Sequence, residues 1–249
     1  MRNDTKIFVY GPPLAPPVEL SRWLLDRFSI PHRFEAAAAG ISAIRSTREK
    51  VSIEPPLLHW KGEASGGLRS SFDRVTGPIA DAHFVTVPAF DTAIVTELMA
   101  NLLGPAVRTF YRYMLPRPDL LKPLATAGLP FLHQIVIQLA YPGWRWVMAK
   151  GLKLAEHDTR ADVAIIQRCF AEVESRLGDS RFLSGDHPGI DDLVFAALAS
   201  PVLLPPEHPV RLPPVETLPE QLRAIITRFR LSSAGDLALR IYAADRGPS

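Results

Sequence analysis

Cysteine and histidine, two residue types that often carry catalysis, form no recognisable cluster in this sequence. Cys169 is the only cysteine, and it lies in an apolar helical pattern with no basic or histidine partner at an obvious spacing. A reactive thiolate needs such a partner, so Cys169 is interpreted as a small packing residue. The seven histidines form no pair at metal-ligand spacing, and His59 alternates with apolar strand residues. No metal site is therefore predicted, and cysteine-based chemistry is disfavoured.

A carboxylate gives the clearest local signal. Asp192 stands three residues after Gly189, at the start of an apolar run. With Gly189 as the N-cap, the Asp192 carboxylate reaches back to the backbone N–H of Gly189 and lies near the positive end of the helix dipole. The spacing predicts a capped core helix, with about 1 kcal/mol contributed by the cap.

Composition narrows the class of protein. The chain has 249 residues, 47% of them hydrophobic, which is enough for one large domain or two ordinary ones. The net charge of +2 is small, and basic and acidic residues are interspersed, so no nucleic acid or membrane partner is expected. No apolar run reaches the roughly 18 residues needed to span a bilayer, and no signal peptide is evident. With a single cysteine, these features predict a soluble cytoplasmic protein.

The elements that must position any site fall into two groups. The first third of the chain reads as short strands with helices between them, ordered β-α-β, irregular helix, β-β, helix. This order predicts a thioredoxin-like α/β domain over residues 1–84. Beyond it, only helical spacing is found, which predicts an all-α domain over residues 85–249. The predicted helices of this second domain are 90–115, 131–152, 160–177, 190–204, 218–230 and 234–245.

The chain resembles the glutathione S-transferase superfamily. The segment FLSGDHPGIDD, which contains the predicted cap, is similar to the family pattern F-L-x-G-D-x-x-S/T-x-A-D, with Gly189 where Ser or Thr is usual. An ordinary capped helix would account for Asp192 but not for the whole lead-in. The two-domain plan agrees with the resemblance, which covers nearly the whole chain and implies that the first domain binds glutathione.

A proline is the first device that the resemblance implies. Pro55-Pro56-Leu57-Leu58 matches the family's V-P-x-L, in which the bond before the proline is cis and exposes a backbone edge to glutathione. Pro56 is the predicted cis residue. Pro55 departs from the family because it lacks the N–H that the usual Val donates. A plain Pro-Pro turn before an edge strand is the alternative.

A serine at the start of the third helix is the second device. Ser70 and Ser71 are the nearest match to the acid-Ser pair that binds the γ-glutamyl end of glutathione in the family. Ser71 would then cap the helix and direct its N–H groups at a carboxylate. Ser70 stands where the family has an acid, and a simple helix cap is the equally weighted alternative.

The third device is a side chain that stabilises the thiolate. GPPLAPPVELSRWLL is similar to the family's G-S-P-x-S-P-x-x-R-x-R-W-L-L, which places Ala15 where Ser or Cys is usual. Tyr10, at the end of the first strand, matches the Tyr that some members use, and its phenol would donate to the thiolate. A packed strand aromatic is the alternative for Tyr10.

The resemblance implies conjugation of glutathione, bound as co-substrate, to a small apolar electrophile. The alternative is a binding or assembly module of the same fold that has lost thiol activation, which Ala15, Pro55 and Ser70 favour. A homodimer is the family expectation, and a role in detoxification follows from conjugation.

Overall fold

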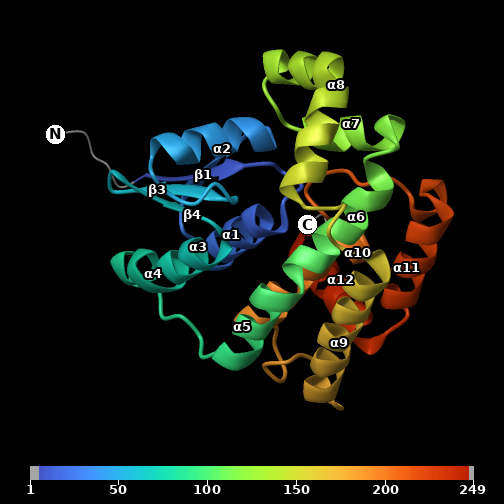
Figure 1. Ribbon diagram of the computed structural model, residues 1–249. Coiled ribbons are helices and arrows are strands. Elements are labelled where there is room, and N and C mark those ends of the chain that lie inside the picture. Colours follow the sequence, from blue (N-terminus) through green and yellow to red (C-terminus); the bar gives the residue numbers. More distant parts are fainter. Residues whose placement is uncertain (1–5, 247–249) are drawn as a thin grey trace. The chain divides into compact units, whose positions relative to one another are not determined.

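The computed structural model describes residues 6–246, which form two compact units (Figure 1). One unit runs to Ala89 and also includes Ala125–Ile135. The other comprises Phe90–Leu124 and the chain from Val136 onward. Sequence reasoning did not anticipate that Ala125–Ile135 groups with the first unit.

A four-stranded sheet organises the first unit. Its strands are β1 (Ile7–Gly11), β2 (His32–Ala36), β3 (Leu57–Trp60) and β4 (Glu63–Gly66), in the order β2-β1-β3-β4. β1 pairs parallel with β2 and antiparallel with β3, and β3 pairs antiparallel with β4. The thioredoxin-like prediction is confirmed.

Alternation along β1 assigns its side chains to two faces of the sheet. Val9 pairs with Phe34 and Leu58, on the face covered by α1 (Pro16–Arg27) and α3 (Leu68–Arg74). Tyr10 lies on the opposite face, where the guanidinium of Arg45 from α2 (Ala39–Arg48) lies over its ring.

Helix α2 packs with its small polar residues inward. Ser42 and Ser46 are buried, whereas Ile41 is 38% and Ile44 58% exposed. The hydroxyls of both serines lack a hydrogen-bond partner within residues 6–246. This arrangement explains why the segment shows no ordinary amphipathic pattern.

The second unit is helical, as predicted. The described residues after Val85 form no strand, and α10 (Ile190–Leu203), at the centre of the unit, is buried over its full length. The single predicted helix 90–115 is divided in two, and α7 was not foreseen. Its helices are α5 (Thr92–Asn101), α6 (Leu103–Met114), α7 (Pro118–Thr126), α8 (Phe131–Gly151, whose first turn belongs to the first unit), α9 (Thr159–Leu177), α10 (Ile190–Leu203), α11 (Glu220–Arg230) and α12 (Ser233–Arg246). The short segments are η1 (Val75–Ile79), α4 (Ala80–Ala82) and η2 (Val215–Thr217).

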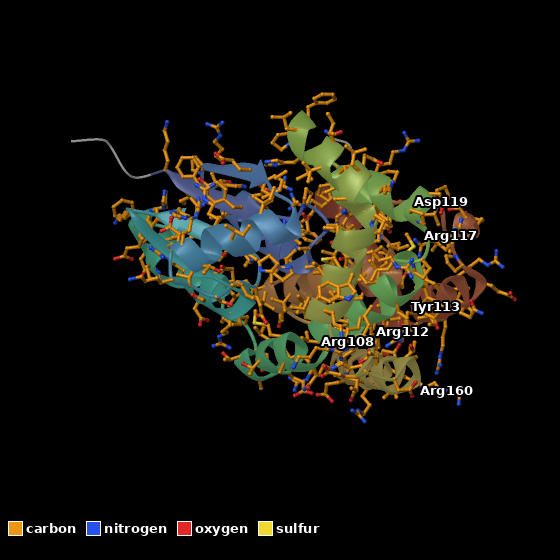
Figure 2. The ribbon with its side chains drawn as sticks, turned by 45° about the horizontal axis from the view of Figure 1, so that its top comes forward. Arg108, Arg112, Tyr113, Arg117, Asp119 and Arg160 are labelled. Carbon is orange, nitrogen blue, oxygen red and sulfur yellow. The ribbon has the colours of Figure 1, made fainter. Side chains whose placement is uncertain are left out.

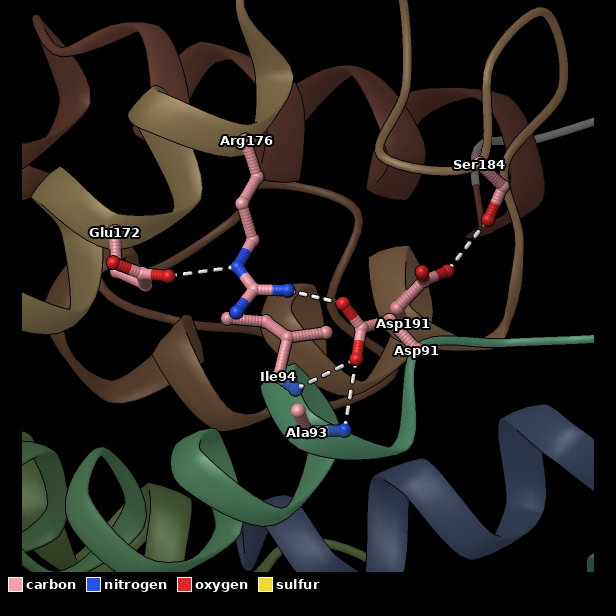
Figure 3. Close-up of polar contacts among 7 residues, drawn as sticks. All are labelled: Asp91, Ala93, Ile94, Glu172, Arg176, Ser184 and Asp191. Carbon is pink, nitrogen blue, oxygen red and sulfur yellow. Dashed lines mark hydrogen bonds and ion pairs between the residues drawn. The ribbon is translucent and has the colours of Figure 1, made fainter.

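The predicted cap of α10 is present. The Asp192 carboxylate accepts the N–H of Gly189 at 2.9 Å, of Leu183 at 2.9 Å and of Ser184 at 3.3 Å. Burial raises the pKa of Asp192, and the three N–H donors oppose that shift. Beside it, the Ser184 hydroxyl donates to Asp191 at 2.6 Å (Figure 3). One carboxylate thus ties the lead-in loop to the central helix.

Two further charged groups hold helices of the second unit. Arg108 of α6, labelled in Figure 2, donates to both carboxylate oxygens of the buried Asp162 of α9. Asp91 caps α5 by accepting the N–H groups of Ala93 and Ile94, and it also pairs with Arg176 of α9 (Figure 3).

Candidate functional site

Tyr10 occupies a crowded position in the first unit. Its side chain is 7% exposed, and its ring centre lies 5.5 Å from that of His59 in an edge-to-face arrangement. The guanidinium carbon of Arg45 lies 3.8 Å from the centre of the same ring. The Tyr10 ring is therefore packed on its strand by His59 of β3 and Arg45 of α2.

The environment of Tyr10 keeps its phenol protonated at neutral pH. Burial raises the pKa of Tyr10, Arg45 lowers it, and Glu35 on the neighbouring strand raises it again. The net direction is upward from the ordinary value of 10.0. A protonated phenol can donate a hydrogen bond to an anion, which is the role predicted for this residue.

The loop before β3 packs against the end of β1. The bond between Pro55 and Pro56 is cis, so that prediction is confirmed. At Gly11 a Cβ atom would lie 2.6 Å from Val18 Cγ2 and 3.5 Å from Pro55 Cβ, which leaves room only for glycine. The Pro56 carbonyl accepts the N–H of Gly67 at 3.0 Å. These contacts bring the ends of β1 and β4 to the Pro55–Pro56 loop.

The expectation that Ser71 caps the third helix is wrong. Gly67 is the N-cap of α3, and its φ of 88° favours glycine over any residue with a side chain. Ser70 and Ser71 therefore lie inside the first turns. Ser70 is exposed, whereas Ser71 is fully buried and its Oγ has no hydrogen-bond partner in the described part of the chain.

Glu54 is an acid near the start of α3 that sequence reasoning did not single out. A Cβ atom at Gly67 would lie 3.9 Å from Glu54 Oε2, so this carboxylate stands beside the start of α3. Glu54 is exposed, and its N–H donates to Ser52 Oγ at 3.3 Å. Its position directly before Pro55-Pro56 was the available signal. The first unit thus offers a phenol, an acid and a proline loop on connected segments.

Ala15 leaves the usual activating position without a donor. It is the N-cap residue of α1, and its methyl side chain makes no capping hydrogen bond. Its carbonyl accepts the N–H groups of Val18 and Glu19. A hydroxyl or thiol is thus absent where the family pattern places one.

Metal and membrane-spanning features are not found in residues 6–246. No group of three or more His, Cys, Asp or Glu side chains there could hold a metal ion. None of the helices in this range has both the length and the hydropathy that crossing a bilayer requires.

Comparison with solved structures identifies the fold of this chain. The chain aligns over 98% of its length, and over 98% of the other chain, with glutathione transferase GSTFuA3 from Phanerochaete chrysosporium, at 14% identity and a TM-score of 0.60. The chain has the glutathione S-transferase fold. Glutathione S-transferase CsGST63524 of Ceriporiopsis subvermispora, solved in complex with glutathione, aligns at 14% identity with a TM-score of 0.54 and the same coverage of both chains. No model of a known protein family and no curated protein matches the sequence. The predicted glutathione S-transferase architecture is thus confirmed at the level of the fold.

Proposed function

We propose that the first unit binds glutathione along the Pro55–Pro56 loop. The thiolate of the bound glutathione, stabilised by Tyr10, then attacks an apolar electrophile. The observation that carries this proposal is the packing of Pro55 against Gly11, the residue directly after Tyr10. The fold supports it, because a structure of the same fold contains glutathione.

The chemistry is a substitution at the electrophile. The thiol proton passes to solvent, and the Tyr10 hydroxyl donates to the thiolate, which lowers the thiol pKa and raises the fraction of nucleophile. Sulfur then forms a bond to carbon, and the leaving group departs with its electron pair. An apolar second substrate keeps water from competing for the thiolate.

Each remaining residue has a proposed place. The Pro55 carbonyl accepts the N–H of the cysteinyl part of glutathione, whereas Pro55 has no N–H to return. Glu54 pairs with the γ-glutamyl ammonium group. Ser70 contacts the γ-glutamyl carboxylate from the exposed side of α3. Ser71 packs beneath the site, because its burial keeps it from the ligand.

A second candidate is a binding module that holds glutathione without conjugating it. Ala15 offers no donor to the thiolate, and the Tyr10 ring is covered by Arg45 on one face and contacts His59 in an edge-to-face arrangement. The two candidates share the glutathione-binding site. They differ in whether the protein activates the glutathione thiol. Conjugation of a chlorodinitrobenzene above the uncatalysed rate favours the transferase, and glutathione binding with no conjugation of several electrophiles favours the module.

Isothermal titration with glutathione tests the location of the site. Glu54→Gln removes the charge that would pair with the ammonium group and should weaken binding about tenfold or more, since a charged hydrogen bond contributes about 1.5–3 kcal/mol. Glu49→Gln is the matched control, because Glu49 is an exposed acid of the same unit near His59. Equal losses in the two variants would indicate a general charge effect and would contradict the proposed site.

The proposal also covers the oligomeric state, location and cellular role of the protein. We expect a homodimer in the cytoplasm, with a role in detoxification, on the strength of the resemblance. Light scattering at several protein concentrations tests the dimer.

A further inference from the structure

Helix α8 exposes large apolar side chains. Val136 is 58%, Leu139 80%, Trp146 63% and Val147 53% exposed, although such residues are usually covered in a soluble protein. At helical spacing Val136 and Leu139 share a side of the first part of the helix, and Trp146 and Val147 are neighbours on the second part; the four are called here the α8 apolar face. A bend at Ala140, which has non-helical dihedral angles, divides the face into two parts.

The opposite side of α8 packs against residues of the second unit. Ile137 and Tyr141 are buried, and the Tyr141 hydroxyl donates to the Leu115 carbonyl at 3.1 Å. Lys122 of α7 donates to the Gln138 carbonyl at 3.1 Å. Because these contacts hold α8 by the side that carries Ile137 and Tyr141, the α8 apolar face is left exposed.

The α8 segment itself carries charge of one sign. Burial raises the pKa of Tyr141 on the inner side of the helix, and Asp119 of α7 lies close enough to raise it further. Between Asp119 and Glu156 the sequence contains no acidic residue, and its cations in that interval are Lys122, Arg145, Lys150 and Lys153. Lys150 follows Trp146 by four residues and so lies on the same side of the helix. The small net charge of the whole chain conceals this basic segment.

The chemistry of the segment selects its occupant. Outward Trp and aliphatic side chains flanked by Lys and Arg are typical of helices that lie in the interface of an anionic bilayer. A second copy of the chain, seated on the same face by two-fold symmetry, would bring four cations against four cations. An anionic phospholipid surface instead complements both the charge and the apolar side chains.

We propose that the α8 apolar face and its flanking cations dock this protein on the surface of an anionic phospholipid bilayer. Trp146, Val147 and Leu139 enter the boundary between headgroups and acyl chains, while Lys150 contacts lipid phosphates. Arg145, four residues after the inward Tyr141, adds positive charge beside the face rather than on it. The docking is peripheral, since no helix within residues 6–246 can cross a membrane.

Vesicle flotation of the full-length protein tests the proposal. Vesicles of phosphatidylcholine mixed with phosphatidylglycerol should carry the protein at low salt and release it at high salt, and vesicles of phosphatidylcholine alone should carry little. Arg145→Gln with Lys150→Gln should lower the partition coefficient about 30-fold, because each cation near an anionic surface contributes about 1 kcal/mol. Leu139→Gln with Trp146→Gln should abolish flotation.

The control variant carries the same kinds of change on another helix. Leu231, 83% exposed after α11, and Arg228 are changed together to Gln, and flotation should be unaffected. All of these positions are exposed, and circular dichroism verifies that each variant is folded. Failure to bind anionic vesicles, or equal binding to neutral ones, would overturn the proposal. A wild-type dimer that Leu139→Gln converts to a monomer would also overturn it, because the face would then pair two copies of the chain.

Discussion

The guanidinium carbon of Arg45 lies 3.8 Å from the centre of the Tyr10 ring. This contact joins α2 to β1. The buried residues of α2 are two serines, Ser42 and Ser46. Burial raises the pKa of Tyr10, and the positive charge of Arg45 opposes that rise. Arg45 therefore offsets part of the effect of burial on the pKa of Tyr10.

Removing the Arg45 charge should raise the pKa of Tyr10 further. We expect Arg45→Gln to move the phenol titration to higher pH, because the opposing cation is lost while burial remains. Ultraviolet difference spectra over a pH series, with Tyr10→Phe as the reference that lacks this transition, measure the shift. An unchanged Tyr10 titration would show that the contact has no electrostatic effect.

Tyr10→Phe should keep glutathione binding and reduce conjugation. Loss of one hydrogen bond to a charged group costs about 1.5–3 kcal/mol, or one to two powers of ten in rate. Steady-state kinetics with a chlorodinitrobenzene give the rate, and titration calorimetry gives the affinity. Equal rates in the two proteins would remove Tyr10 from the mechanism.

His59 should make the first unit sensitive to mild acid. Burial lowers the pKa of His59 from 6.5, Arg45 and Arg74 add to that shift, and Glu49 opposes it. The unfolded chain therefore takes up the proton first, so the stabilising contribution is complete above pH 6.5 and is lost as the pH falls from there toward the lowered pKa. Urea unfolding across this range should show a shallower loss in His59→Gln than in wild type. The same slope in both would contradict the assignment.

Asp192→Ala should destabilise the second unit. The carboxylate accepts three backbone N–H groups, and its loss leaves them without that partner. The expected loss is about 1–2 kcal/mol or more, or a failure to fold. Thermal unfolding measures it, and Asp186→Ala, an exposed acid in the same loop, is the control. A melting temperature equal to that of wild type would exclude the capping role.

The fold was predictable where local chemistry and packing agree. The β-branched and aromatic residues after Lys6 form β1, Asp192 caps α10, and the Pro55–Pro56 bond is cis. In each case the residues that give the signal are also the residues that make the contacts. The bend of α8 at Ala140 was not foreseen, because an apolar helical pattern does not reveal a change of direction.

The candidate site was predictable only in part. The resemblance implied that the third helix starts at Ser71, whereas the left-handed conformation of Gly67 starts α3 earlier. Glu54 was missed because it lies outside the segment in which the family pattern has its acid. Contacts across the sheet, such as that of Arg45 with Tyr10, depend on strand register and cannot be read from spacing along the chain.

The pKa of the glutathione thiol in the complex is the most direct test of the proposed function. Thiolate absorbance, recorded over a pH series with and without the protein, measures it. The proposal predicts a thiol pKa below that of free glutathione in wild type and a return toward the free value in Tyr10→Phe. A bound thiol whose pKa equals that of free glutathione would contradict activation and leave the binding module as the function.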